Sequence, residues 1–158
     1  MELEELALKV GMLLKQKGFL LATAESCTGG WTAEVLTSIP GSSEWYERGF
    51  ITYSNLSKRE MLGVNPDILS GFGAVSMETA KEMAKGALRH SRADVALSIT
   101  GIAGPGGGSI DKPVGTVCFA WAAKGGKVKT GKKLFDGDRK AVRRQAVEEA
   151  LNGLLGFC

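Results

Sequence analysis

Short apolar runs alternate with amphipathic segments along the 158-residue chain, and this alternation constrains the fold more than any other feature. The short runs predict buried β-strands, and apolar residues spaced three and four apart predict helices that pack one face on a sheet. Strands are predicted at residues 19–24, 49–54, 94–100, 115–123 and 127–135. Helices are predicted at residues 2–17, from about 28 to 38, after Asn55, after Ser76 and from about 138 to 155. This pattern favours an α/β fold: a single three-layer α/β/α sandwich over residues 1–158, with a mixed, mostly parallel sheet.

Composition favours a globular protein without a membrane segment. Hydrophobic residues make up 44% of the chain, but no apolar run approaches the ~18 residues that span a bilayer. The first helix carries charges throughout, unlike a secretion signal. We therefore expect a cytoplasmic protein that makes no membrane contact.

Cysteine usage and charge argue against further classes of protein. The three cysteines, Cys27, Cys118 and Cys158, have no paired spacing, so we expect free thiols rather than a disulfide framework. No cluster of His, Cys and carboxylate residues has metal-ligand spacing, so we expect neither a metal nor another cofactor. The net charge is only +3 and acidic residues are interleaved with basic ones, so nucleic acid is not an expected partner.

The first strand ends in a cluster of reactive side chains within LLATAESCTGG, residues 20–30. In open α/β sheets, ligands bind at the carboxyl ends of the strands. Ser26 is a candidate nucleophile, because free N–H groups at the start of the next helix would stabilise an alkoxide or an oxyanion. The candidate oxyanion donors are the N–H groups around Cys27, Thr28, Gly29 and Gly30. The alternative is structural: Ser26 and Thr28 only cap the helix.

Cys27 is the rival nucleophile, because a thiol is intrinsically the better nucleophile. A cysteine nucleophile normally needs a histidine base, and the one histidine of the chain, His90, falls at the end of a predicted surface helix. The neighbouring Glu25 has two open interpretations: it orients a group of the pocket, or it pairs with a nearby base and has no chemical role.

A lysine is the remaining candidate base, and YSNLSK places Tyr53 and Lys58 after the second strand. If Asn55 caps the helix, Lys58 is its third residue, where the helix dipole and Arg59 both lower the lysine pKa. A shift from about 10.4 to about 7.5 requires roughly 4 kcal/mol, and a helix terminus supplies about 0.3–1 kcal/mol, so burial must supply most of it. Tyr53 is expected to hydrogen-bond between Lys58 and either the serine or the leaving group. The alternative is a solvated lysine and a strand aromatic.

A glycine-rich loop, GIAGPGGGS at residues 101–109, follows the third predicted strand. Its composition suits an anion-binding nest, although it has neither a GK[ST] ending nor a GxGxxG pattern. Thr100 and Gly101 are candidates to bind phosphate or ribose, and the alternative is an elaborate connection. Together with Glu25–Gly30 and Ser54–Lys58, this segment lies at the carboxyl end of a strand, so the three are expected to share one pocket.

Six segments together resemble the CinA carboxy-terminal domain family, in particular its stand-alone nicotinamide-nucleotide amidases. They are AESCTGG (24–30), GSSEWYERGFITYSNLSK (41–58), GAVS (73–76), SITGIAGPGGGS (98–109), KPVGTV (112–117) and GDRKAVRRQA (137–146). The resemblance implies hydrolysis of the carboxamide of nicotinamide mononucleotide (NMN) to nicotinic acid mononucleotide and ammonia, in pyridine nucleotide recycling. It also implies self-association, so a homo-oligomer is expected.

The resemblance further implies a Ser-Lys-Tyr mechanism without a cofactor. The family's nucleophile falls on Ser26, its tyrosine on Tyr53 and its lysine on Lys58. Three more positions are expected to contact the substrate: Ser43, Thr100 and Arg139. Larger members carry an additional amino-terminal domain; this chain begins at Met1 with the amidase-like part, so no activity of that domain is expected.

Two other classes of function remain open. One is a catalytically silent nucleotide-binding module that uses the same glycine loops. The other is a competence- or DNA-damage-associated factor, which the family's history and the basic stretch DRKAVRR suggest. Three aromatic residues look exposed and are expected either to form an interface or to line the pocket: Trp31, Trp45 and Tyr46.

Overall fold

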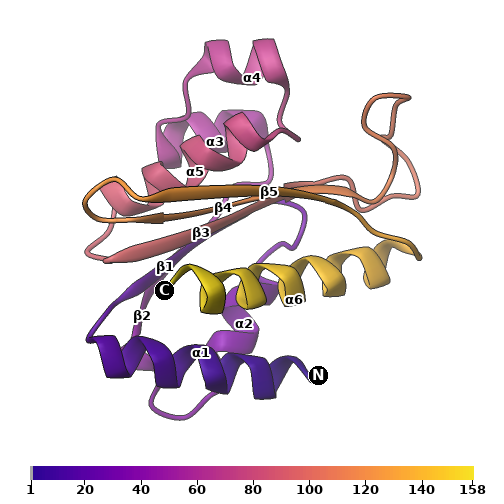
Figure 1. Ribbon diagram of the computed structural model, residues 1–158. Coiled ribbons are helices and arrows are strands. Elements are labelled where there is room, and N and C mark those ends of the chain that lie inside the picture. The colour runs from indigo at the N-terminus through magenta and orange to yellow at the C-terminus, as the bar shows by residue number, and fades with distance from the viewer. Residues whose placement is uncertain (1) are drawn as a thin grey trace.

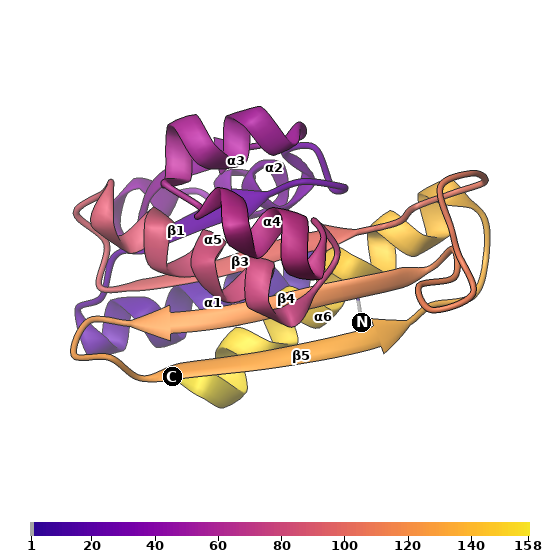
Figure 2. The same cartoon turned by 90° about the horizontal axis from the view of Figure 1, so that it is seen from above.

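The computed structural model describes residues 2–158, which form a five-stranded sheet with helices on both faces (Figure 1). The strands are β1 (Leu21–Glu25), β2 (Tyr46–Ile51), β3 (Val95–Gly101), β4 (Thr116–Ala123) and β5 (Val128–Leu134). The helices are α1 (Leu3–Lys17), α2 (Trp31–Thr37), α3 (Asn55–Leu62), α4 (Pro66–Phe72), α5 (Met77–Arg89) and α6 (Arg139–Phe157), with a 3-10 turn at Ser42–Glu44. In Figure 2 the strands are seen between their two helical layers.

The sheet has the order β2-β1-β3-β4-β5. Strands β2, β1 and β3 are parallel, whereas β4 runs antiparallel to β3 and β5 antiparallel to β4. The crossovers between the parallel strands pass through helices, and a tight turn joins β4 to β5. The predicted mixed sheet of an α/β fold is confirmed, and the carboxyl ends of β1 and β3 lie side by side.

Two apolar layers hold the helices on the sheet. Helices α1, α2 and α6 cover one face, where leucines of the helices pack on large residues of β3 and β4 such as Leu97 and Phe119. Helices α3, α4 and α5 cover the other face, where β1, β3 and β4 present mainly alanines. Small residues permit close approach there: a Cβ at Gly86 of α5 would lie 2.1 Å from the Leu62 carbonyl oxygen. The expected three-layer arrangement follows from these two faces.

Side-chain caps start the helices where polar residues predicted them. Ser76 accepts a hydrogen bond from Thr79 N at the start of α5, and Asp138 accepts one from Ala141 N at the start of α6. At α3, however, the predicted cap Asn55 is wrong. Ser54 is the cap, since its hydroxyl accepts from Ser57 N while Ser57 Oγ accepts from Ser54 N. Lys58 is therefore the fourth residue of the helix rather than the third.

Two further differences from the sequence predictions concern β2 and α4. Strand β2 spans 46–51 rather than 49–54. Its start was predicted too late because the polar residues of an edge strand carry no apolar signal. It ends earlier than predicted because its partner β1 ends at Glu25, whose carbonyl accepts from Thr52 N. Helix α4 was not predicted. Its start signal is Asn65 followed by Pro66: the Asn65 side chain accepts from Asp67 N.

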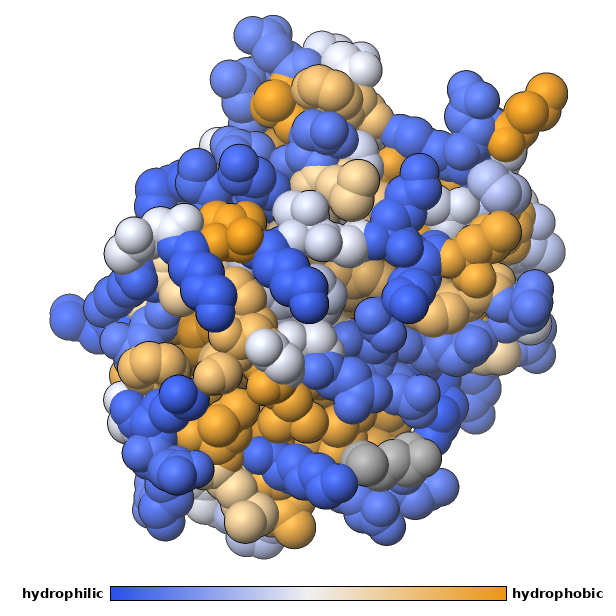
Figure 3. All heavy atoms as spheres, viewed as in Figure 1, coloured by the Kyte–Doolittle hydropathy of each residue, from blue (hydrophilic) through white to orange (hydrophobic). Residues whose placement is uncertain are grey.

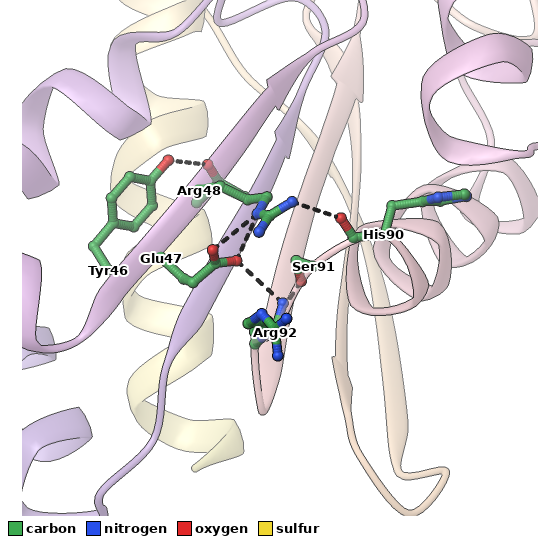
Figure 4. A network of polar contacts seen from close by, with 8 residues as sticks. Tyr46, Glu47, Arg48, His90, Ser91 and Arg92 are labelled. Carbon is green, nitrogen blue, oxygen red and sulfur yellow. Dashed lines mark hydrogen bonds and ion pairs between the residues drawn. The ribbon is translucent and has the colours of Figure 1, made fainter.

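Edge strand β2 is fastened to the α5–β3 connection by charged side chains (Figure 4). Arg48 pairs with Glu47 and donates to His90 O at 3.1 Å, and Glu47 accepts from Arg92 N at 3.2 Å. Charges on an edge strand oppose pairing with another sheet. His90 is exposed on this surface, as the sequence suggested.

Apolar side chains are unevenly distributed over the side of the molecule seen in Figure 3. Hydrophilic side chains cover most of this view, and apolar ones gather in its lower part, where α1 and α6 lie (Figure 3). Trp45 does not contribute an exposed ring as expected: it is only 4% exposed, and a Cβ at Gly11 would lie 2.6 Å from its indole. Within residues 2–158, none of the helices has the length and apolar character needed to cross a membrane.

Candidate active site

The fold brings Ser26 and Lys58 into direct contact. Lys58 Nζ lies 3.0 Å from Ser26 Oγ, and it donates to Thr52 O at 3.0 Å and to Tyr53 O at 3.5 Å. Ser26 directly follows β1, and its N–H donates to Ile99 O of β3, so the sheet fixes its backbone. The first turn of α3 presents the lysine to it across 32 residues of sequence.

Burial shifts the pKa of the Lys58 amine below its usual value, because a charge is costly away from water. The side chain is 1% exposed, and none of the ion pairs among residues 2–158 includes it. Cys27 opposes the shift to a smaller extent. A buried amine without a carboxylate partner is suited to accept a proton.

Cys27 is unsuited to act as the nucleophile. Burial, assisted by the charge of Glu25, raises the pKa of its thiol to about 12. Only the thiolate is strongly nucleophilic, and it is scarcely populated near neutral pH with such a pKa. The geometry and the pKa values both favour Ser26.

Glu25 caps helix α2 from inside the fold. Its carboxylate accepts from Thr28 Oγ1 at 2.6 Å, from Thr32 N at 2.9 Å and from Ala33 N at 3.1 Å, and the side chain is 1% exposed. The formal N-cap, Gly30, has no side chain to do this. Glu25 therefore performs the capping that Ser26 and Thr28 were expected to supply in the structural interpretation, and the hydroxyl of Ser26 is left for Lys58.

The capping contacts give a first testable prediction. Glu25→Ala would leave the buried Thr32 N–H, the part-buried Ala33 N–H and the Thr28 hydroxyl without this acceptor, so we expect the free energy of unfolding to fall by about 2–4 kcal/mol. Urea denaturation measures this. The control is Glu34→Ala on the exposed side of the same helix, which should change stability by less than about 0.5 kcal/mol. Equal effects of the two substitutions would contradict the capping role.

Tyr53 lies at the mouth of the site rather than between the lysine and the serine. Its hydroxyl accepts from Arg139 Nη2 at 3.2 Å, and Arg139 Nη1 donates to Gly104 O at 2.7 Å. The Tyr53 side chain is 63% exposed. The expected bridge from Tyr53 to Lys58 is absent from the described structure; the tyrosine instead joins the arginine and the glycine loop in one wall.

A cavity of about 250 Å³ opens onto the Ser26–Lys58 pair. Its lining includes residues of all three segments that the sequence predicted to meet, together with residues outside them: Ser26, Cys27, Tyr53, Asn55, Lys58, Ala74, Val75, Thr100, Gly101, Ala103 and Arg139. Its charged lining residues are Lys58, which contacts Ser26, and Arg139, which contacts Tyr53. Among residues 2–158, no three His, Cys, Asp or Glu side chains are grouped as a metal site would require.

Not every expected substrate contact reaches this cavity. Thr28, Gly29 and Gly30 are not among its lining residues, and Thr28 is turned toward Glu25. Thr100 does line it, although its hydroxyl already donates to Ala74 O at 2.8 Å. Ser43 is exposed and precedes β2, so it lies at the amino ends of the parallel strands, whereas Ser26 lies at their carboxyl ends. Within this chain, Ser43 therefore lies away from the cavity.

Two polar residues near the site were missed by sequence reasoning. Asn55 lines the cavity, which the expected capping role obscured. Arg143 of α6 donates to the carbonyl oxygens of Cys27 and Thr28. Its spacing of four from Arg139 puts both arginines on one side of a helix, which was the available signal.

Comparison with known proteins agrees with this geometry. The sequence pattern of the CinA C-terminal domain matches residues 3–158. The chain belongs to the CinA C-terminal domain family. Within the family it is 56% identical over 153 residues to the nicotinamide-nucleotide amidohydrolase PncC of Escherichia coli K12, covering 97% of this chain and 93% of that protein. It is 51% identical over 151 residues to the protein of the same name from Pseudomonas putida, covering 95% and 93%.

A solved CinA-family structure has the same fold. The crystal structure of competence/damage inducible protein CihA from Agrobacterium tumefaciens superposes with a TM-score of 0.95 at 48% sequence identity, covering 98% of this chain and 94% of that one. The α/β fold expected from the alternating pattern is therefore also that of a CinA relative.

Proposed function

We propose that this chain is a nicotinamide-nucleotide amidase that hydrolyses the carboxamide of NMN to nicotinic acid mononucleotide and ammonia. The observation that carries the proposal is the contact of 3.0 Å, at the end of β1, between Ser26 Oγ and the buried amine of Lys58, which belongs to none of the ion pairs among residues 2–158. The names of the curated relatives support the substrate. The reaction would serve pyridine nucleotide recycling.

In the proposed first step, neutral Lys58 acts as the base. Its two N–H bonds can donate to the carbonyls of Thr52 and Tyr53, which leaves the nitrogen lone pair directed at Ser26. Lys58 takes the hydroxyl proton while Ser26 Oγ forms a bond to the amide carbon, and the carbonyl electron pair moves to oxygen.

Two backbone N–H groups are suited to hold this oxyanion. One belongs to Cys27, the residue after the nucleophile, which lines the cavity. The other belongs to Gly101: Ile99 O accepts from Ser26 N, and two residues further along β3 the backbone faces the same side, beyond the end of β1. A side chain at Gly101 would not fit, since its Cβ would lie 2.7 Å from Val117.

The remaining steps return each proton through Lys58. The protonated amine donates to the amide nitrogen as the C–N bond breaks, and ammonia leaves an acyl-serine. A water then gives a proton to Lys58 and attacks the ester carbon, after which Lys58 returns the proton to Ser26 as the acid is released. Arg139 with the Tyr53 hydroxyl is suited to hold the nucleotide part of the substrate at the mouth.

The direct test is ammonia release from NMN by the purified protein, with nicotinamide riboside as a comparison that lacks the phosphate. Ammonia from NMN supports the amidase. NMN binding by calorimetry without ammonia would favour the silent nucleotide-binding module, and DNA binding without ammonia would favour the competence-associated factor. The proposal also expects a cytoplasmic, self-associating protein that needs no nucleic acid.

The pH dependence of the reaction follows from the lowered pKa of Lys58. The amine is active when neutral, so kcat/KM should rise with pH as its proton is lost, with a midpoint below its usual 10.5. Cys27, with a pKa of about 12, should add no further change near neutral pH. Initial rates of ammonia release between about pH 6 and pH 10 measure this limb. A rate that falls over that range would contradict Lys58 as the base.

A further inference from the structure

Arg143 of α6 donates hydrogen bonds to the backbone next to the nucleophile. Its Nε donates to Cys27 O at 3.0 Å and its Nη2 donates to Thr28 O at 3.1 Å, across 116 and 115 residues of sequence. Charged donors make stronger hydrogen bonds than neutral ones, and the planar guanidinium fixes the direction of both. The C-terminal helix is thus fastened to the two residues that follow Ser26.

The segment that accepts these hydrogen bonds, residues 27–30, contains two glycines and is therefore flexible by composition. Gly29 and Gly30 have φ angles of 61° and 106°, a conformation that other residues rarely adopt, and glycines leave such a turn with many alternative conformations. Local hydrogen bonds are few: Gly29 N donates to Ser26 O and Trp31 N to Thr28 O, each at 3.1 Å. External contacts must therefore select one conformation.

Those external contacts hold the side chain of Thr28 and the backbone around it. Glu25 accepts from the Thr28 hydroxyl, while Arg143 holds the carbonyl oxygens of Cys27 and Thr28. A peptide group is planar, so fixing these two carbonyls fixes the orientation of the peptides between Cys27 and Gly29. The sheet holds the N–H side of Ser26, so the carbonyl side depends on Cys27. A rotation of the Cys27 backbone would turn the Cys27 N–H and shift the Ser26–Cys27 peptide that carries the nucleophile.

Arg143 is itself held away from the chemistry. Its guanidinium lies 5.5 Å from the centre of the Trp31 ring, and none of the ion pairs in residues 2–158 includes it. It is not among the residues that line the cavity around Ser26. Nε and Nη2 thus donate to the turn, and Arg143 lines a neighbouring cavity of about 500 Å³ together with Trp31 and Arg139.

We propose that Arg143 is a positioning residue for the amidase reaction: by holding the carbonyls of Cys27 and Thr28, it keeps the Ser26 hydroxyl in line with Lys58 and the Cys27 N–H directed at the oxyanion. The inference rests on the proposed function for its substrate. Its loss should act on kcat, because misplacing a nucleophile slows the reaction while the groups that bind the substrate remain in place.

The test compares Arg143→Met with Arg144→Met, the adjacent arginine, which pairs with Glu148 one turn further along α6. We expect Arg143→Met to lower kcat for NMN by about 10- to 100-fold with KM changed less than about threefold, and Arg144→Met to leave both unchanged. Arg143→Lys, which supplies one donor direction, should restore part of kcat. In Arg143→Ala, added guanidinium should raise kcat, whereas it should not do so in Ser26→Ala.

Three outcomes would overturn the positioning role: equal kcat in the two methionine variants, a change in KM alone, or a kcat loss explained by a lower folded fraction in thermal melts. A second readout separates this proposal from the proposed function. A fluorophosphonate reacts with an activated serine without NMN: the serine oxygen bonds to phosphorus and fluoride leaves. Its rate of Ser26 labelling should therefore fall in Arg143→Met. If the wild type is labelled but releases no ammonia, NMN is refuted as the substrate, and the labelling rates still test the positioning role of Arg143. If the wild type shows neither labelling nor ammonia release, both proposals are refuted.

Discussion

Replacing Ser26 by alanine is expected to lower kcat for ammonia release from NMN by about 10⁴-fold or more, because no other group can form the acyl intermediate. Ser26 is 7% exposed, and alanine fits the same space. The residual rate would come from the oxyanion donors and from substrate binding alone. Ammonia release by coupled assay measures the loss, and calorimetry should show that NMN still binds.

The matched control for Ser26 is its neighbour. Cys27→Ala removes a thiol whose pKa is raised to about 12, so we expect kcat to stay within about fivefold of the wild type. Fragment-ion mass spectra of protein trapped during turnover should locate the acyl group on Ser26 rather than on Cys27. Large losses in Cys27→Ala together with an active Ser26→Ala would assign the nucleophile to the thiol.

Replacing Lys58 by methionine is expected to lower kcat by about 10²- to 10⁴-fold, since it removes the base but keeps a long, unbranched side chain. The substitution leaves the Thr52 carbonyl without its hydrogen-bond donor, which lowers stability, but it also removes a buried amine, which raises stability. The free energy of unfolding should therefore change by no more than about 1 kcal/mol. Steady-state kinetics and urea denaturation measure the two quantities on the same sample.

The rising pH limb should also disappear in Lys58→Met. The control is Lys81→Met on the exposed side of α5, which should preserve both the rate and the limb. A Lys58→Met protein that keeps the wild-type rate and pH profile would show that another group removes the serine proton.

The reactive pair was predictable because local patterns identify both members. An apolar strand that stops before Ser26 marks a carboxyl end, and one histidine at a surface position leaves lysine as the base. Strand boundaries were less predictable at β2, where Tyr46, Glu47 and Arg48 belong to an exposed edge and carry no apolar alternation. The chain also gave no local reason to bury Trp45; its burial comes from the gap that Gly11 leaves in α1.

The roles of the charged residues were not predictable in the same way. Glu25 is buried because it accepts the free N–H groups at the start of α2, whose N-cap is a glycine. Tyr53 accepts a hydrogen bond from Arg139, which lies 86 residues later in the sequence. Arg143 belongs to a basic stretch that looks like a solvated surface until α6 packs against the nucleophile turn. Each of these contacts depends on two elements that meet only in the folded chain.

The sequence by itself determined the alternation of strands and helices, the polar ends of the strands and the kinds of reactive group, because these depend on neighbours within a few residues. Only the tertiary structure decided that Lys58 meets Ser26 without a carboxylate partner, that Glu25 caps a helix, that Ser43 lies at the other end of the strands and that Arg143 holds the turn. Hydrogen-bond partners and desolvation depend on which surfaces are buried together, and the packing of distant segments alone sets this.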